Sequence, residues 1–191
     1  MKRTLIVVAH LDDESFGIGG TLAQMCACEP SNVKVKVLCN GRDDTNSLAR
    51  VGAFLEIQRK LGFEWIIHGY PDMELEMVPL KEVTSLIEYE IKTFLPQRII
   101  TLSENDIHQD HKLVSHAAKI AARPARTSVE EIYEFKTPGC EPYSSTFFDT
   151  VNDVRNVIST KMWMIGQYTT EVPPQIEDKE YFKTVYRKFN L

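Results

Sequence analysis

The feature that most constrains the fold of this chain is a regular alternation of short apolar runs with longer amphipathic stretches. Residues 5–9 read Leu-Ile-Val-Val-Ala, a continuous apolar run of the kind found in strands that are covered on both faces. Residues 80–94 instead carry large apolar side chains at helical spacing, and this stretch stops before Pro96. Alternation of this kind predicts βαβ units, and therefore a mostly parallel sheet with helices on both faces.

The same patterns divide the whole chain into expected elements. Strands are expected at residues 5–9, 33–38, 64–68, 98–102, 131–135 and 144–149. Helices are expected between the earlier strands and again at 151–165 and 178–189, where Phe182, Tyr186 and Phe189 would dock on the body. We therefore predict one α/β domain over residues 1–191, with a Rossmann-like, doubly wound sheet of strand order 3-2-1-4-5 in a three-layer arrangement.

Composition narrows the class of protein further. The 191 residues contain 22 Lys plus Arg against 27 Asp plus Glu, and the resulting net charge of −5 argues against a nucleic-acid partner. No apolar run approaches the roughly 20 residues of a membrane span. The apolar stretch that follows the N-terminal Met-Lys-Arg-Thr is too short for a signal peptide. We therefore expect a cytoplasmic domain without nucleic-acid or membrane partners.

Several residues that attract attention are expected to be structural. The cysteines are Cys26, Cys28, Cys39 and Cys140, and the C-x-C spacing of the first two matches neither a zinc knuckle nor a thioredoxin motif. We expect reduced, partly buried thiols. The glycines within residues 17–20 fail the dinucleotide fingerprint, and close packing of a helix on the sheet is the expected reason for them. His68 and His116 are expected to play structural roles.

Two polar segments concentrate residues that can carry chemistry. The segment His10–Glu14 follows the first expected strand, and the segment His108–His111 follows the fourth. Because strands 1 and 4 are neighbours in the predicted order, both segments should meet where ligands bind in such sheets. Together they supply three histidines and three aspartates, a set that suits zinc. Taken singly, each segment has an alternative explanation as a helix N-terminus or as polar surface, and only their meeting favours a metal site.

These segments carry a resemblance to a known family. Ala9-His10-Leu11-Asp12-Asp13-Glu14, the helix start at residues 17–23 and His108-Gln109-Asp110-His111 resemble the motifs of the PIG-L/LmbE-like zinc-dependent N-deacetylases. The resemblance extends over most of the chain, to about Tyr168. Leu11 and Gln109 replace prolines that are common in those motifs, and neither proline supplies a ligand.

The resemblance implies a metal centre with an open position. It assigns His10, Asp13 and His111 as the metal ligands, with Zn²⁺ as the expected ion and Fe²⁺ or another divalent metal as the alternative. Two imidazoles and one carboxylate leave room for water, as in catalytic zinc sites.

The resemblance also implies roles for the neighbouring residues. Asp12 would be the general base, and His108 would stabilise the oxyanion in its protonated form. Asp110 would orient His108 and favour its charge, while Arg50 and Asp72 would bind the substrate. Glu14 is expected at the helix N-terminus rather than among the ligands.

The resulting expectation is a de-N-acetylase, a zinc-dependent hydrolase acting on an N-acetylglucosamine-type conjugate, a small-molecule substrate. A metal-dependent phosphoester hydrolase and a catalytically inactive, metal-bound sugar-binding module are the alternatives. Relatives often associate, so both a monomer and a homo-oligomer stay open.

Overall fold

The computed structural model describes residues 1–41, 44–123, 126–138, 148–173 and 175–188. The strands are β1 Thr4–Val8, β2 Val33–Gly41, β3 Glu64–Pro71, β4 Arg98–Leu102, β5 Glu131–Phe135, β6 Thr150–Asp153 and β7 Lys179–Arg187. The α-helices are α1 Asp13–Cys28, α2 Asp44–Leu61, α3 Leu80–Phe94, α4 Gln109–Ala122 and α5 Ile158–Ile165. Short 3₁₀ turns are η1 Pro30–Asn32, η2 Leu75–Met77 and η3 Arg155–Val157.

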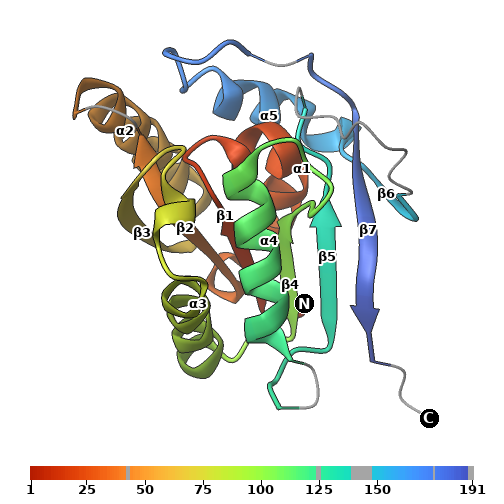
Figure 1. The fold of residues 1–191 in the computed structure, drawn as a ribbon. Helices are drawn as coiled ribbons and strands as arrows, with labels where there is room; N and C mark the ends of the chain where they lie inside the picture. The colour runs from red at the N-terminus through yellow and green to blue at the C-terminus, as the bar shows by residue number, and fades with distance from the viewer. Residues whose placement is uncertain (42–43, 124–125, 139–147, 174, 189–191) are drawn as a thin grey trace.

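The strands form one mixed sheet between two layers of helices. Its order is β3-β2-β1-β4-β5-β7-β6, so the predicted order 3-2-1-4-5 holds for the five parallel strands. Helices α3 and α4 pack against each other on one face, while α1 packs on α5 on the opposite face (Figure 1). This confirms the predicted three-layer α/β class. No helix in the described parts of the chain is long and apolar enough to cross a membrane.

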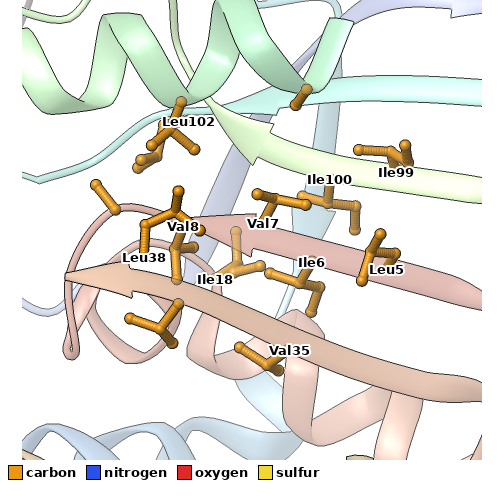
Figure 2. Packing of buried hydrophobic residues seen from close by; sticks show 14 of the residues in the cluster. Leu5, Ile6, Val7, Val8, Ile18, Val35, Leu38, Ile99, Ile100 and Leu102 are labelled. Carbon is orange, nitrogen blue, oxygen red and sulfur yellow. The ribbon is translucent and has the colours of Figure 1, made fainter. Parts of the chain in front are cut away.

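The hydrophobic core explains why β1 lies in the middle of the parallel strands. All five of its residues are buried, and Leu5 to Val8 pack between side chains of β2, β4 and α1 (Figure 2). Thr4 aligns with Val33 on one side and with Arg98 on the other, so β1 and β4 run in register to the same edge. Burial on both faces is what the continuous apolar run predicts.

The last part of the chain differs from the prediction. Residues 178–189 were expected to be helical, but residues 179–187 form β7, which is antiparallel to both β5 and β6. Phe182 and Tyr186 are four residues apart, a spacing that fits one face of a helix and one face of a strand equally well. Phe182 is buried and Tyr186 packs on the core, so the expected docking is present in another conformation. Phe189 lies outside the described residues.

The region before β7 also departs from a single helix. Instead of a helix over 151–165, the chain forms β6, the turn η3 and the shorter helix α5. The Asp153 carboxylate accepts a hydrogen bond from the Arg155 N–H at 3.0 Å, and this contact turns the chain away from β6. Most of the strand expected at 144–149 lies outside the described residues.

Helix α1 has an irregular turn near its start, and a residue of β7 accepts the backbone N–H groups that follow this turn. Ile18 has non-helical angles, φ −132° and ψ 25°. The Glu180 carboxylate of β7 accepts the backbone N–H groups of Gly20 and Thr21, both at 2.8 Å, and forms a buried ion pair with Lys161 at 2.7 Å. The glycines have the predicted packing role, because a Cβ on Gly20 would come within 2.5 Å of Val154.

Candidate active site

The site forms where β1 and β4 end side by side. The chain leaves β1 through Ala9 and His10, and α1 begins at Asp13; the His10 N–H donates to Asp13 Oδ2 at 2.8 Å, which closes the turn between them. The loop after β4 leads into α4, whose first turn carries Asp110 and His111. Parallel neighbouring strands end at the same edge, so two segments about a hundred residues apart in sequence meet there.

Three buried side chains converge on one point. His10 Nδ1 lies 3.2 Å from His111 Nε2 and 3.6 Å from Asp13 Oδ2, and His111 Nε2 lies 3.3 Å from Asp13 Oδ1. Donor atoms about 2.0–2.1 Å from a tetrahedral zinc ion are roughly 3.3 Å apart. The three observed separations therefore fit one tetrahedral metal ion.

The other nitrogen of each imidazole is held by its own carboxylate. His10 Nε2 lies 3.0 Å from Asp110 Oδ2, and His111 Nδ1 lies 2.8 Å from Asp106 Oδ2. Ionised carboxylates only accept, so the histidine protons belong on these two nitrogens. In the neutral rings, the lone pairs of His10 Nδ1 and His111 Nε2 then face each other and Asp13. Such a cluster can hold a cation at its centre, and imidazole and carboxylate are suitable ligands for zinc or iron.

The carboxylates around the cluster favour a positive charge at its centre. Burial lowers the pKa of His111, but the carboxylates of Asp13 and Asp106 outweigh it and raise that pKa to about 10. Burial likewise opposes ionisation of Asp13, yet the two histidines hold its pKa well below the ordinary value. Without a metal, a proton on His111 thus supplies the positive charge that a bound cation would replace.

His108 lies beside the cluster as a neutral donor. Its Nδ1 accepts the Asp110 backbone N–H at 3.2 Å, so His108 caps α4 and its remaining proton belongs on Nε2. Its ring centroid is 4.6 Å from that of His111 and 4.7 Å from that of His10. Burial, followed by the neighbouring imidazoles of His111 and His10, lowers the pKa of His108, which disfavours the protonated form that we expected.

The carboxylate of Asp110 orients a different histidine from the expected one. Asp110 Oδ2 contacts His10 Nε2 and accepts the Met73 N–H at 2.8 Å, whereas Asp110 contacts His108 through its backbone N–H. The prediction that this carboxylate orients His108 is therefore wrong. The reason is the helix cap, because His108 Nδ1 already accepts a hydrogen bond and has no proton to offer.

Asp12 occupies a strained position next to the cluster. Its φ of 128° lies in a region that side chains other than glycine rarely adopt, and its side chain makes no cap hydrogen bond to α1. Burial and the neighbouring Asp13 raise the pKa of Asp12 well above its ordinary value, against the opposing charge of Arg50. A carboxyl group with a raised pKa is suited to taking up and returning a proton near neutral pH.

A polar pocket of about 350 Å³ opens in front of the cluster. Within it, Arg50 donates to Asp72 Oδ2 at 2.9 Å and to Glu171 Oε1 at 2.8 Å, and lies 3.8 Å from Asp12 Oδ2. The pocket is lined by His10, Asp12, Asn46, Arg50, Asp72, Met73, His108 and Glu171. The structure thus brings together at one edge of the sheet all the site residues named from the sequence: His10, Asp12, Asp13, Arg50, Asp72, His108, Asp110 and His111.

Other residues at the site were not expected. Asp106 holds His111 and Glu171 holds Arg50, and neither was named from the sequence. A signal existed for Asp106, since a ligand histidine needs an acceptor for its second N–H and Asp106 is an acidic residue in the same loop. Glu171 follows α5, far along the chain, and no local pattern points to it.

The remaining candidates lie around or away from the cluster. Glu14 lies behind Asp12, where its carboxylate accepts the Asp12 N–H at 3.1 Å and the Tyr168 hydroxyl at 2.7 Å. His108 also brings a ring nitrogen within 4.8 Å of ring nitrogens of His10 and His111, so these three histidines form another candidate metal group. A further group combines His10, Asp72 and Cys39, but burial raises the pKa of the Cys39 thiol far above the ordinary value, which disfavours a thiolate ligand. Cys26 is buried, Cys28 is exposed, and both are free thiols, while Cys140 lies outside the described residues. His68 contacts Lys36 Nζ at 2.8 Å, away from the pocket.

Comparison with known proteins identifies the family of this chain. The family model PIG-L, GlcNAc-PI de-N-acetylase, matches residues 5–122. The chain is 26% identical over 200 residues to a probable N-acetyl-alpha-D-glucosaminyl L-malate deacetylase 2 of Bacillus cereus, covering 93% of this chain and 87% of that protein.

Solved structures share the fold at low sequence identity. A deacetylase triple mutant from the teicoplanin biosynthetic pathway superposes with a TM-score of 0.74 at 20% identity, covering 88% of this chain and 82% of that one. GalB, the 4-carboxy-2-hydroxymuconate hydratase of Pseudomonas putida KT2440, also gives 0.74 at 18% identity, covering 100% and 99%. The fold therefore supports different reactions, and activity must be argued from the site. The family match spans β1 to α4, including every residue of the converging cluster, and the chain belongs to the PIG-L family.

Proposed function

We propose that this chain is a metal-dependent hydrolase that removes the acetyl group from an N-acetylglucosamine-type conjugate, with zinc as the ion and iron as the alternative. One observation carries the proposal: two histidine lone pairs and the Asp13 carboxylate converge within 3.2–3.6 Å, beside a strained carboxyl group that faces a polar pocket. The family model and the sugar conjugate named for the Bacillus cereus relative support an N-acetylated amino sugar as the substrate.

The ligand residues would hold the metal and fix its charge. A divalent cation bound by His10, Asp13 and His111 would supply Lewis acidity to the amide carbonyl and to water. Asp110 and Asp106 keep the two imidazoles in the tautomers that offer lone pairs. Asp12, outside this ligand set and lining the pocket, keeps its carboxylate available for protons.

Asp12 would move one proton during the reaction. The oxygen of water bonds to the amide carbon, and Asp12 accepts the proton that this water loses. When the carbon–nitrogen bond breaks, Asp12 returns the proton to the leaving nitrogen. The products are acetic acid and the free amine, which exchange one proton to give acetate and the ammonium form, so atoms and charge balance without a further reagent. The raised pKa of Asp12 suits both halves of this transfer.

His108 and Arg50 would stabilise the reacting groups. Neutral His108 donates from Nε2 to the carbonyl oxygen as negative charge develops there, an interaction of the kind worth about 3–4 kcal/mol. Asp72 and Arg50, which line the same pocket, would offer an acceptor and a donor to sugar hydroxyls.

Acetate release tests the proposal. The metal-loaded protein is incubated with a panel of N-acetylglucosamine conjugates, with and without a chelator, and with Zn²⁺ or Fe²⁺ restored afterwards. We expect release that the chelator abolishes and the metal restores. A phosphate monoester in parallel tests the alternative hydrolase chemistry. Absence of acetate from every conjugate, with one metal ion bound per chain, would contradict the proposal.

A further inference from the structure

The guanidinium group of Arg50, which lines the pocket, already donates hydrogen bonds to two carboxylates. Arg50 Nε donates to Glu171 and one terminal nitrogen donates to Asp72, while the other terminal nitrogen faces Asp12 at 3.8 Å. A carboxylate binds a guanidinium best through two neighbouring N–H groups. The third nitrogen, Nη2, can form such a pair of N–H groups with Nε or with Nη1. Nε already donates to Glu171 and Nη1 already donates to Asp72. An anionic substrate group could therefore form a two-point pair with Arg50 only by displacing Glu171 or Asp72.

Glu171 is held in place by its own segment. Its Oε1 also accepts the Thr170 hydroxyl at 3.0 Å, and its N–H donates to the Tyr168 carbonyl at 3.1 Å. Tyr168 is buried against the ring of Phe16 and donates its hydroxyl to Glu14 at 2.7 Å. The turn that carries Glu171 is thus anchored to the first turn of α1, next to Asp12.

The charges that line the pocket favour one class of substrate group. Two carboxylates that line the pocket, Asp72 and Glu171, flank the guanidinium of Arg50. Burial opposes ionisation of Glu171, but its hydrogen bond with Arg50 and the charge of Arg50 lower its pKa, so Glu171 is ionised at neutral pH. Carboxylate oxygens accept hydrogen bonds from hydroxyl and ammonium groups and repel other anions.

We propose that Glu171 is a specificity-determining residue, which keeps Arg50 occupied and so selects conjugates whose group next to the sugar is uncharged or cationic and excludes those that carry a carboxylate there. This inference rests on the proposed deacetylase function for the identity of the sugar. It requires only binding, so it can be tested separately from turnover.

The test compares three N-acetylglucosamine glycosides that differ in charge: the aminoethyl (cationic), methyl (neutral) and malyl (anionic) glycosides. Binding to the metal-loaded protein is measured by calorimetry at low ionic strength, and acetate release is measured in parallel. We expect the wild-type protein to bind the malyl glycoside at least about tenfold more weakly than the methyl glycoside, and the aminoethyl glycoside at least as tightly.

Two variants separate the effect of Glu171 from the overall charge. Glu171→Gln keeps the shape of the side chain, and we expect it to reduce the discrimination against the malyl glycoside by about fivefold or more. Glu177→Gln removes the same charge from the same C-terminal segment, where Glu177 faces Lys136 at 3.7 Å and lies outside the pocket lining, and it should keep the wild-type ratio. Circular dichroism verifies that both variants are folded.

The outcomes distinguish this inference from the proposed function. Equal binding of the methyl and malyl glycosides, or an unchanged ratio in Glu171→Gln, would overturn the role of Glu171 even if acetate is released. Discrimination that depends on Glu171, without acetate from any glycoside, would support the role of Glu171 and contradict the deacetylase. Failure of all three glycosides to bind would contradict both.

Discussion

At the scale of single residues, the site works through pairs in which one side chain fixes the proton of another. Asp110 fixes His10, Asp106 fixes His111, and the Asp110 backbone N–H fixes His108. The first two pairs leave ring lone pairs that face the proposed metal position, and the third leaves a proton on the ring nitrogen of His108 that does not cap α4. Similar histidines therefore acquire opposite chemical roles from their hydrogen-bond partners.

The two histidines of α4 and its cap provide a matched comparison. We expect His111→Ala to lose the metal, because it removes a ligand. His108→Ala should keep the metal and lower kcat by about 10²–10³-fold, because it removes only the donor to the oxyanion. Metal content by atomic absorption and acetate release under saturating substrate check both variants. Loss of metal from His108→Ala with retention in His111→Ala would reverse the assignment.

Asp106 should matter although it does not reach the reacting atoms. Asp106→Asn weakens the hold on His111 Nδ1, and we expect metal affinity to fall by about 10–100-fold, as for other partners of ligand histidines. A competition titration with a fluorescent chelator measures the affinity. Asp153→Asn makes the same change at an exposed carboxylate and should leave the affinity unchanged. Equal affinities in the two variants would contradict the role of Asp106.

The raised pKa of Asp12 has a consequence for stability. The unfolded chain releases this proton around the ordinary value of 3.8, whereas the folded chain holds it to higher pH, so stability falls as pH rises between the two values. Asp12→Asn removes the charge that burial disfavours, so it should stabilise the metal-free protein near pH 7.5. Near pH 3 the charge-related gain should vanish. Urea unfolding at both pH values checks this, and a gain independent of pH would contradict it.

Residues of this site differ in how far the sequence could predict them. His10, Asp13 and His111 belong to short motifs that follow neighbouring strands, so pattern and topology together locate them. The partner of His108 could not be predicted, because the choice depends on whether its Nδ1 accepts the α4 cap or donates to a carboxylate. Glu171 could not be predicted at all, since its contact with Arg50 depends on a turn that only the folded chain brings to the pocket.

At the scale of elements, helix α1 connects the site to the packing of the sheet. Its N-terminal turn carries Asp13, and its glycines allow β5 and the segment after β6 to approach closely. A Cβ on Gly17 would come within 2.3 Å of the Phe135 ring. The helix therefore has no room for side chains on this face.

Two glycine substitutions test this packing. Gly20→Ala introduces a contact of 2.5 Å with Val154, and we expect it to destabilise the protein by about 1–3 kcal/mol. Gly52→Ala in α2 has nothing within 4 Å and should stabilise by about 0.5–1 kcal/mol. Thermal unfolding of both variants provides the measurement. Destabilisation by Gly52→Ala equal to that by Gly20→Ala would show that helix glycines matter here for another reason.

Helices and strands with a clear spacing of apolar residues could be predicted from the sequence. The five parallel strands and helix α3 have long, unambiguous patterns, and the structure contains them. The prediction of a helix at residues 178–189 is wrong, because the spacing of Phe182 and Tyr186 fits both a helix and a strand. The residues between them do not distinguish the two. What determines the strand is pairing with β5 and β6, which is a tertiary effect.

At the scale of the whole molecule, we expect a bound metal to stabilise the folded protein by connecting the segments that follow β1 and β4. His10 and Asp13 follow β1, whereas His111 follows β4, so a bound ion would connect both segments. At free metal about 100 times the dissociation constant, binding stabilises a folded protein by about 2.7 kcal/mol. Chelation should then lower Tm by roughly 5–10 °C in a chain of this size. Differential scanning calorimetry with and without EDTA checks this, and His111→Ala should be insensitive to EDTA.

Glu180 connects the hydrogen bonding of helix α1 to the last strand of the sheet. Its carboxylate completes the hydrogen bonding of α1 from a position 160 residues later in the chain. During synthesis on the ribosome, the segments His10–Glu14 and His108–His111 emerge long before Glu180 does. In the folded chain the N–H groups of Gly20 and Thr21 and the ammonium of Lys161 all pair with Glu180. We therefore expect the helix that carries Asp13 to be completed only when β7 has paired with β5.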